Sequence, residues 1–158
     1  MGAEATGDSF SDGTAIHRAV SEATRRGYEL ELSGQLTPSW QLQGSYVVND
    51  SSLTSASTSP RKQFKLASTY RLDGMLSGLT LGAATRWQSS ANAGVLKQSS
   101  FWLLDLMARY QVTPKLSVSA NVNNLFDKAY FSGMRDFGRI QYTWGAPRSF
   151  NLGVRYDF

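Results

Sequence analysis

The single histidine of this 158-residue chain is the first residue to test for chemistry. His17 lies near Asp12 and Ser21, and a histidine beside a carboxylate and a hydroxyl can activate a nucleophile in a hydrolase. The segment around these residues is polar and weakly patterned, so nothing in it fixes their mutual geometry. We therefore expect no catalytic residue and no enzyme activity, with a hydrolase built on His17 as the weaker alternative.

Metal and cofactor chemistry has few donors in this sequence. The absence of cysteine excludes disulfides, zinc–thiolate sites and iron–sulfur clusters, and one histidine leaves little for a multi-histidine metal site. Glu29 and Glu31, two positions apart, could bind a cation, but contact with other protein groups is the favoured interpretation. We expect no intrinsic cofactor and no metal site. The net charge is only +4 and the basic residues are scattered, so nucleic acid is not an expected partner.

The elements that position any site are predicted to be β-strands. After a polar start, apolar and polar residues alternate with a period of two, which is typical of strands with two unlike faces. Seven segments follow this pattern: residues 28–36, 40–48, 63–72, 79–87, 102–112, 116–123 and 150–158. The predicted fold is all-β and antiparallel, with about seven strands.

The two faces of these strands differ in chemistry. One face is uncharged, and its only serine and threonine residues are Ser68 and Thr85. Its aromatic residues lie near the strand ends and its aliphatic residues in the middle, the arrangement of a membrane-spanning barrel with two aromatic girdles. A soluble β-sandwich is the weaker alternative. The other face carries the charges, among which we assign five to the lumen of the barrel: Arg71, Arg86, Asp105, Arg109 and Arg155.

The connections between the strands alternate in length. Residues 37–39, 73–78 and 113–115 are short turns, whereas residues 49–62, 88–101 and 124–148 are long and polar. Outer-membrane barrels have short periplasmic turns and long extracellular loops. The pattern therefore predicts an outer-membrane location, with lipid as a partner of the uncharged face.

Several motifs resemble one family. The sequences RGYELEL from Arg26, NVNNLFDKAYF from Asn121 and GAPRSFNLGVRYDF from Gly145 are similar to the carboxy-terminal barrel part of TonB-dependent outer-membrane receptors, in particular receptors for ferric siderophores of the hydroxamate or pyoverdine type. The resemblance covers about residues 19–158, and residues 1–11 carry no matching motif. It implies a 22-stranded barrel with a plug domain inside and energy supplied by TonB. The ferric siderophore would be the transported ligand.

The resemblance also assigns roles to residues. Six residues at or beyond the outward strand ends are candidate siderophore contacts, with membrane-interface anchoring or solvation as the alternative for each: Trp87, Trp102, Tyr130, Arg135, Tyr142 and Trp144. The five lumen charges would face the plug. Tyr156 and Phe158 resemble the terminal signal that the barrel-assembly machinery binds.

These observations divide the chain into residues 1–23, a polar outward segment that is part of a loop, and residues 24–158, the barrel portion. Neither a plug, a signal peptide nor a TonB box is expected within it. Seven strands leave two open edges, so we expect a part of a larger barrel. The alternative is a self-contained small outer-membrane barrel with a structural or adhesive role, which needs an eighth strand from residues 15–21.

Overall fold

The computed structural model describes residues 2–9, 15–20, 25–51, 59–93, 95–136 and 140–158. Within these ranges nearly all of the regular structure is strand. The strands are β1 (Gly2–Ser9), β2 (Ala15–Val20), β3 (Arg25–Thr37), β4 (Trp40–Ser51), β5 (Lys62–Arg71), β6 (Leu79–Gln88), β7 (Ala91–Ala93), β8 (Leu96–Gln98), β9 (Phe101–Thr113), β10 (Leu116–Asn123), β11 (Phe131–Asp136), β12 (Ile140–Trp144) and β13 (Ser149–Tyr156). A 3-10 turn, η1 (Gly74–Leu76), joins β5 to β6. No helix of the described residues is long and apolar enough to cross a membrane.

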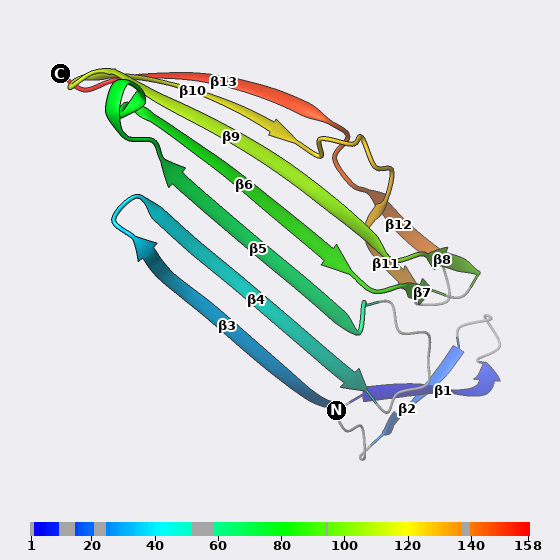
Figure 1. Cartoon of the computed structure of the whole chain (residues 1–158). Helices are drawn as coiled ribbons and strands as arrows, with labels where there is room; N and C mark the ends of the chain where they lie inside the picture. Colours follow the sequence, from blue (N-terminus) through cyan, green and yellow to red (C-terminus); the bar gives the residue numbers. More distant parts are fainter. Residues whose placement is uncertain (1, 10–14, 21–24, 52–58, 94, 137–139) are drawn as a thin grey trace.

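The seven predicted strands form one antiparallel sheet. Its order is β13-β10-β9-β6-β5-β4-β3, so neighbours in sequence are neighbours in the sheet (Figure 1). The prediction of seven antiparallel strands is confirmed, although most strands begin or end a few residues from the predicted positions. The sheet is open: β3 and β13 are its two edges.

Short turns lie at one end of the sheet and long connections at the other (Figure 1). Two of the turns have the sequence Thr-Pro-x, and in both the threonine hydroxyl accepts backbone N–H groups. Thr113 Oγ1 accepts from Leu116 N at 3.0 Å, and Thr37 Oγ1 accepts from Ser39 N at 3.4 Å. Such local bonds replace those that the chain loses where a strand ends. The carboxy terminus lies at this short-turn end (Figure 1).

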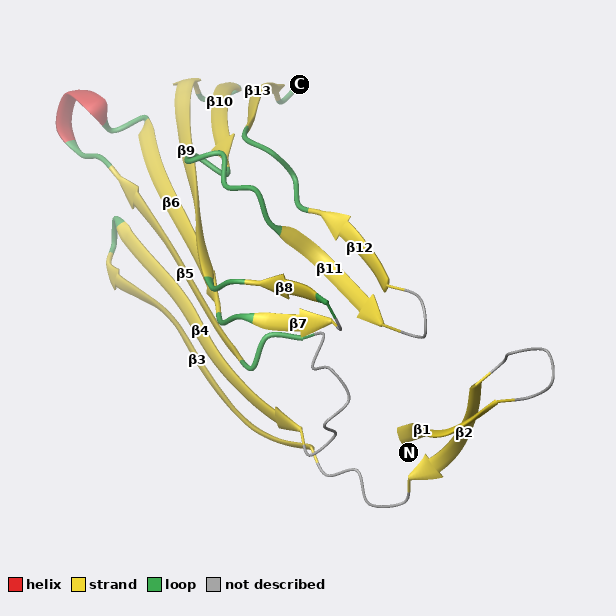
Figure 2. Cartoon of the chain, turned by 90° about the vertical axis from the view of Figure 1, so that its right-hand side faces the viewer, coloured by secondary structure: helices red, strands yellow, loops and turns green. Residues whose placement is uncertain are grey.

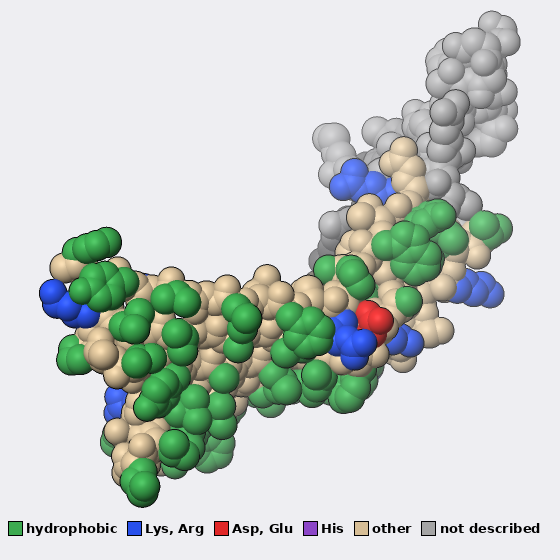
Figure 3. Space-filling view, turned by 90° about the horizontal axis from the view of Figure 1, so that it is seen from above, with side chains coloured by type: hydrophobic (Ala, Val, Ile, Leu, Met, Phe, Trp, Pro, Cys, Tyr) green, Lys and Arg blue, Asp and Glu red, His purple; other side chains and the backbone are tan. Residues whose placement is uncertain are grey.

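Strand register places like residues on like faces. One row crosses all seven strands through Gly34, Leu42, Ser68, Ala83, Leu106, Val122 and Phe150, with no charge in it. Large aliphatic side chains of this face are exposed, for example Leu32 at 62% and Leu152 at 88%. Hydrophobic side chains are accordingly spread over the surface along the sheet (Figure 3). An extended exposed apolar face is typical of a surface covered by lipid or protein.

The serine and the threonine of the apolar face are both hydrogen-bonded within the protein. Ser68 Oγ accepts a hydrogen bond from the indole Nε1 of Trp40 at 2.8 Å, and Thr85 Oγ1 donates to the carbonyl of Leu103 at 3.0 Å. Hydrocarbon offers no partner for a polar group, so internal pairing is what a lipid-facing surface requires.

Residues 2–20 contain two strands that the sequence pattern did not predict. β1 and β2 pair with each other in a separate two-stranded sheet, with Ala5 opposite His17. The segment that might have supplied an eighth barrel strand is therefore paired elsewhere. The side chain of His17, and the whole of Asp12 and Ser21, lie outside the part of the chain that the structure describes.

The two later long connections also contain hairpins, where the sequence predicted only polar loops. β7 pairs with β8, β11 pairs with β12, and both hairpins project from the long-loop end of the sheet (Figure 2). They pack on each other through Ala91, Ala93 and Met134, which are buried. The buried apolar residues of the described ranges thus lie among these connections and, as Phe101 and Leu103, at the adjoining end of β9.

Candidate ligand-binding surface

The last long connection is tied to the sheet by Asn124. This residue is 3% exposed and has a positive φ of 51°, a conformation that asparagine tolerates better than most residues. Its side-chain Nδ2 donates to the carbonyls of Lys128 and Ala146 at 3.0 and 3.1 Å, while its Oδ1 accepts from the N–H of Lys128 at 2.9 Å. The NNLFDKAYF motif is therefore a compact loop that holds the start of the connection to its end.

Tyr130 lies where this loop folds back over the sheet. Its ring stacks at a tilt on Phe101, with centroids 4.8 Å apart. Its carbonyl accepts a hydrogen bond from Gly145 N at 2.8 Å, and a Cβ added at Gly145 would lie 2.0 Å from the Tyr130 ring. Only glycine leaves room for the ring at this position, which explains the glycine of the GAPR motif in structural terms.

A recess of about 200 Å³ opens on the polar face beside Tyr130. The side chains that line it on this side come from β5, β6, β9, the loop that precedes β11 and the start of β11. They are Gln63, Lys65, Arg86, Gln88, Phe101, Leu103, Tyr130 and Ser132. Phe101 and Leu103 are buried, which gives the recess an apolar floor under a rim of amides and cations.

The two cations that line this recess, Arg86 and Lys65, differ in their ion pairing. Arg86 Nη2 lies 3.5 Å from Asp105 Oδ2, in an ion pair whose arginine side chain is half exposed. Asp105 also accepts a hydrogen bond from the backbone N–H of Asn124 at 2.7 Å through its other oxygen, Oδ1. Lys65 lies directly opposite Arg86 in the register, and no ion pair of Lys65 is found among the described residues. Asp105 thus connects the wall of the recess to the base of the last connection.

The other predicted lumen charges lie toward the short-turn end of the same face. Arg71 and Arg109 are both paired with Thr80 across the sheet. Arg109 Nη2 donates to Ser117 Oγ at 3.3 Å, and Arg155 Nε lies 3.0 Å from Asp157 Oδ1. The polar face therefore carries a recess with two cations, Lys65 and Arg86, near its long-loop end. Near its short-turn end it carries dispersed arginines.

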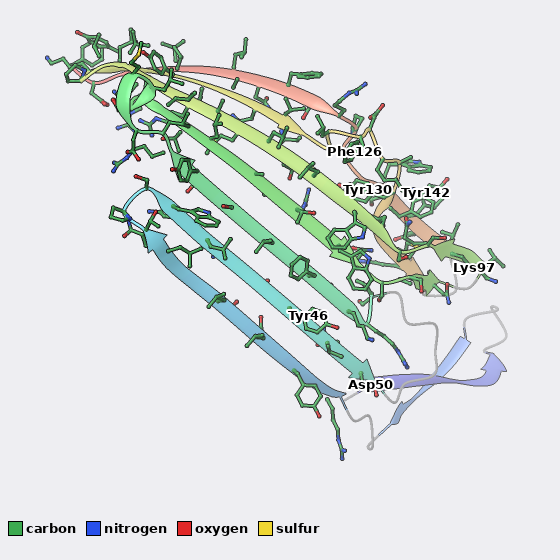
Figure 4. All side chains as sticks on the ribbon, in the orientation of Figure 1. Tyr46, Asp50, Lys97, Phe126, Tyr130 and Tyr142 are labelled. Carbon is green, nitrogen blue, oxygen red and sulfur yellow. The ribbon has the colours of Figure 1, made fainter. Side chains whose placement is uncertain are left out.

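The six candidate ligand contacts fall into separate groups. Trp87 and Trp102 are paired across β6 and β9 on the apolar face, where Trp102 also contacts Phe64. Of the six, Tyr130 and Trp87 line the recess, Trp87 from a strand position that belongs to the apolar face. Tyr142 and Trp144 form an aromatic cluster with Phe131 on the β11–β12 hairpin, and Arg135 lies on the same hairpin opposite Gln141. Figure 4 shows Tyr130 and Tyr142 near the long-loop end of the sheet.

Apart from Arg86, which was a predicted lumen charge, and Trp87, the remaining recess residues were not among the sequence candidates. Lys65 and Gln63 were visible as polar-face positions of a strand, but their importance depends on a loop that returns from 65 residues further along the chain. Among the described residues, no group of three or more acidic, histidine or cysteine side chains could hold a metal ion.

An open antiparallel sheet with one uncharged face, aromatic strand ends and long connections at one end defines a wall segment of an outer-membrane β-barrel. Comparison with known proteins identifies which kind. Residues 3–125 match the family described as TonB dependent receptor-like, beta-barrel, and the chain belongs to this family. The match takes in residues 3–18, where no motif had suggested it.

Related sequences extend the match along the chain. The chain is 40% identical over 151 residues to the ferripyoverdine receptor of Pseudomonas aeruginosa, and the alignment covers 87% of the chain and 18% of the relative. It is 36% identical over 149 residues to the ferric-pyoverdine BN7/BN8 receptor of Pseudomonas putida, covering 90% and 18%. The chain thus spans about 18% of the length of these relatives.

Solved structures agree with this assignment. The receptor FpvA of P. aeruginosa in complex with a heterologous pyoverdine and iron superposes with a TM-score of 0.81 at 33% identity, covering 99% of this chain and 23% of that one. The complex of FpvAI with pyocin S2 superposes with a TM-score of 0.78 at 32% identity, covering 99% and 22%. The prediction of a TonB-dependent receptor of the siderophore branch is confirmed at the level of family and fold.

Proposed function

We propose that the protein carrying this chain is an outer-membrane receptor that binds a ferric siderophore of the pyoverdine class and imports it with energy from TonB. One observation carries the proposal: 40% identity to a ferripyoverdine receptor over 87% of the chain. The two-faced sheet supports it, because it suits a barrel wall between lipid and a polar lumen. The chain performs no chemistry on the ligand in this proposal.

In the proposed receptor the long connections and the recess contribute to ligand binding. Tyr130 lines the recess, and Tyr142, Trp144 and Arg135 lie on the hairpin beyond it, so these residues are proposed siderophore contacts. Trp87 and Trp102 lie on the apolar face with Phe64, and we assign them to membrane-interface anchoring, the alternative that the sequence left open.

The polar face is proposed to surround a plug domain in the complete receptor. Arg71, Arg109 and Arg155, near the short-turn end, would donate hydrogen bonds to that plug. Arg86 and Asp105 lie nearer the long-loop end, where plug and ligand would meet. Neither the plug nor TonB has a counterpart within the residues of the structure.

Tyr156 and Phe158 are proposed to form the signal for the barrel-assembly machinery. Their rings are in edge-to-face contact, with centroids 5.2 Å apart, and Phe158 is fully exposed at the end of the chain. An exposed aromatic pair beside an open strand edge suits recognition by another protein. A self-contained small barrel is not favoured, because β2 pairs with β1 rather than with an edge of the sheet.

Uptake of ⁵⁵Fe tests the function in cells that express the full-length protein. Iron would be supplied as ferric pyoverdine, as a ferric trihydroxamate or as a ferric catecholate, with and without TonB. We expect uptake of ferric pyoverdine that disappears when either the receptor or TonB is removed. Uptake that is unchanged by deletion of the receptor, or that occurs only with the catecholate, would refute the proposal.

A further inference from the structure

Two cations of the recess face each other without enough negative charge between them. Lys65 and Arg86 are directly opposite across β5 and β6, an arrangement that places Cβ atoms about 5 Å apart. Like charges in this position repel. Asp105 pairs with Arg86 at 3.5 Å, and no carboxylate of the described residues pairs with Lys65. The charged residues that line the recess are thus both cations, and Glu31, the acidic residue of the same register row, is separated from Lys65 by Ser45.

The position of this pair along the strands places it near the mouth of the lumen. Phe64 and Trp87 are the sequence neighbours of Lys65 and Arg86, and they point to the opposite, apolar face. Both contact the ring of Trp102 there. Aromatic side chains of this kind mark the headgroup level of a membrane, so the cations lie at that level on the lumen side.

The other groups of the recess extend the donor set. Gln63 and Gln88 form a second opposed pair, one step nearer the long loops on the same face. Their amides can donate hydrogen bonds, and the stacked rings of Phe101 and Tyr130 form an apolar wall beside them. Charged and amide donors beside an aromatic wall suit an anionic oxygen group carried on a flat or apolar arm.

We propose that Lys65 and Arg86 form a subsite for a carboxylate group of the incoming ferric siderophore, with Asp105 as the residue that positions Arg86. The inference rests on the proposed function and adds to it the chemistry that this part of the wall recognises. Lys65 supplies the unpaired charge, and Arg86 supplies a guanidinium that Asp105 holds toward the recess. Binding of a carboxylate would relieve the repulsion between the two cations.

The experiment uses the full-length receptor in detergent and ferric pyoverdine as the probe. Dissociation constants would be measured for the wild type and for Lys65→Gln, Arg86→Gln and the double variant, at several salt concentrations. We expect each single change to weaken binding about tenfold and the double change to weaken it further, with a smaller dependence on salt. Lys65→Arg should keep most of the affinity. Lys115→Gln, at the short-turn end, removes the same charge and is expected to bind like the wild type.

The outcomes separate this inference from the proposed function. A wild-type receptor that does not bind ferric pyoverdine refutes the function. A wild type that binds, with Lys65→Gln and Arg86→Gln equal to Lys115→Gln, refutes the subsite alone. Variants with unchanged affinity but a lower unfolding temperature would show that the pair contacts the plug instead, which also overturns the subsite. Loss of affinity with an unchanged unfolding temperature supports it.

Discussion

The indole Nε1 of Trp40 donates a 2.8 Å hydrogen bond to Ser68 Oγ across the apolar face of the sheet. The two residues lie on adjacent strands, diagonal to each other in the register of β4 and β5. Ser68 and Thr85 are the serine and the threonine of that face, and the bond of Ser68 pairs a donor and an acceptor that lipid would leave unpaired. The pairing explains how a serine is accommodated among lipid-facing side chains.

Replacement of Ser68 by alanine should therefore destabilise the receptor. We expect Ser68→Ala to lower the free energy of unfolding by about 1 kcal/mol, because the indole N–H loses its partner. Denaturant titration of the full-length protein in lipid bilayers measures this. Ser45→Ala on the polar face of β4 is the matched control, because the Ser45 side chain makes no hydrogen bond to any residue that the structure describes. Equal effects of the two substitutions would contradict the prediction.

The two faces should respond differently to a charge. Leu106→Arg places a cation in the middle of the apolar face, where we expect a loss of about 2–4 kcal/mol if lipid covers it. Asn121→Arg places the same side chain at nearly the same level on the polar face and should have little effect. The folded yield and the unfolding free energy of the two variants in bilayers would be compared to test this. A greater loss for Asn121→Arg would mean that the faces are assigned the wrong way round.

Gly145 should not tolerate a side chain. The added Cβ of Gly145→Ala would lie 2.0 Å from the Tyr130 ring, so the ring must move off Phe101, with an expected destabilisation of about 1–3 kcal/mol. Limited proteolysis of the last connection in intact cells reports the displacement. Gly133→Ala, which meets no atom within 4 Å, serves as the control. The double change Gly145→Ala with Tyr130→Ala should recover part of the protection.

Asn124 offers a way to separate hydrogen bonding from backbone conformation. Asn124→Ala loses the side-chain bonds to Lys128 and Ala146 and retains a positive φ that alanine disfavours, so we expect a loss of about 3 kcal/mol or more. Asn124→Gly loses the same bonds but adopts the backbone conformation freely, and should be about 1 kcal/mol less damaging. Unfolding free energies of the two variants test this. Alanine and glycine variants of equal stability would show that the backbone conformation contributes nothing.

Phe158 provides a test of the assembly signal. Phe158→Ala should lower the amount of receptor in the outer membrane several-fold while leaving the unfolding temperature of the assembled fraction unchanged, because recognition and stability are separate properties. Immunoblots of membrane fractions and thermal unfolding give the two readouts. Phe126→Ala removes an exposed ring from a loop and should change neither. A lower unfolding temperature with normal amounts would assign Phe158 to the aromatic girdle alone.

The strands of the sheet were predictable because the alternation of apolar and polar residues that specifies each strand lies within its own segment. Alternation within a segment such as residues 102–112 specifies both the strand and its lipid-facing side, and register confirms the assignment row by row. The β7–β8 and β11–β12 hairpins were missed, since they are short and their buried positions include small residues such as Ala91 and Ala93. β1 and β2 were missed for a related reason, because the sequence around His17 alternates poorly.

The recess was only partly predictable for a different reason. Arg86, Asp105 and Tyr130 each stood out by type, but nothing local brings Tyr130 onto Phe101 or joins Asp105 to Asn124. These contacts depend on how the NNLFDKAYF loop folds back, which requires the paired strands around it. Lys65 shows the same limit: its charge is visible in the sequence, whereas its position opposite Arg86 requires the register of β5 and β6.

The spacing of aromatic residues along β9 sets a hydrophobic thickness for the membrane around the receptor. Trp102 and Tyr110 lie eight positions apart on the apolar face, which is about 27 Å along a strand. At a tilt of about 40° this corresponds to about 21 Å across the bilayer. Such a short span matches a thin membrane, so lipids with short acyl chains should hold the receptor without mismatch, whereas long-chain lipids would have to thin around it.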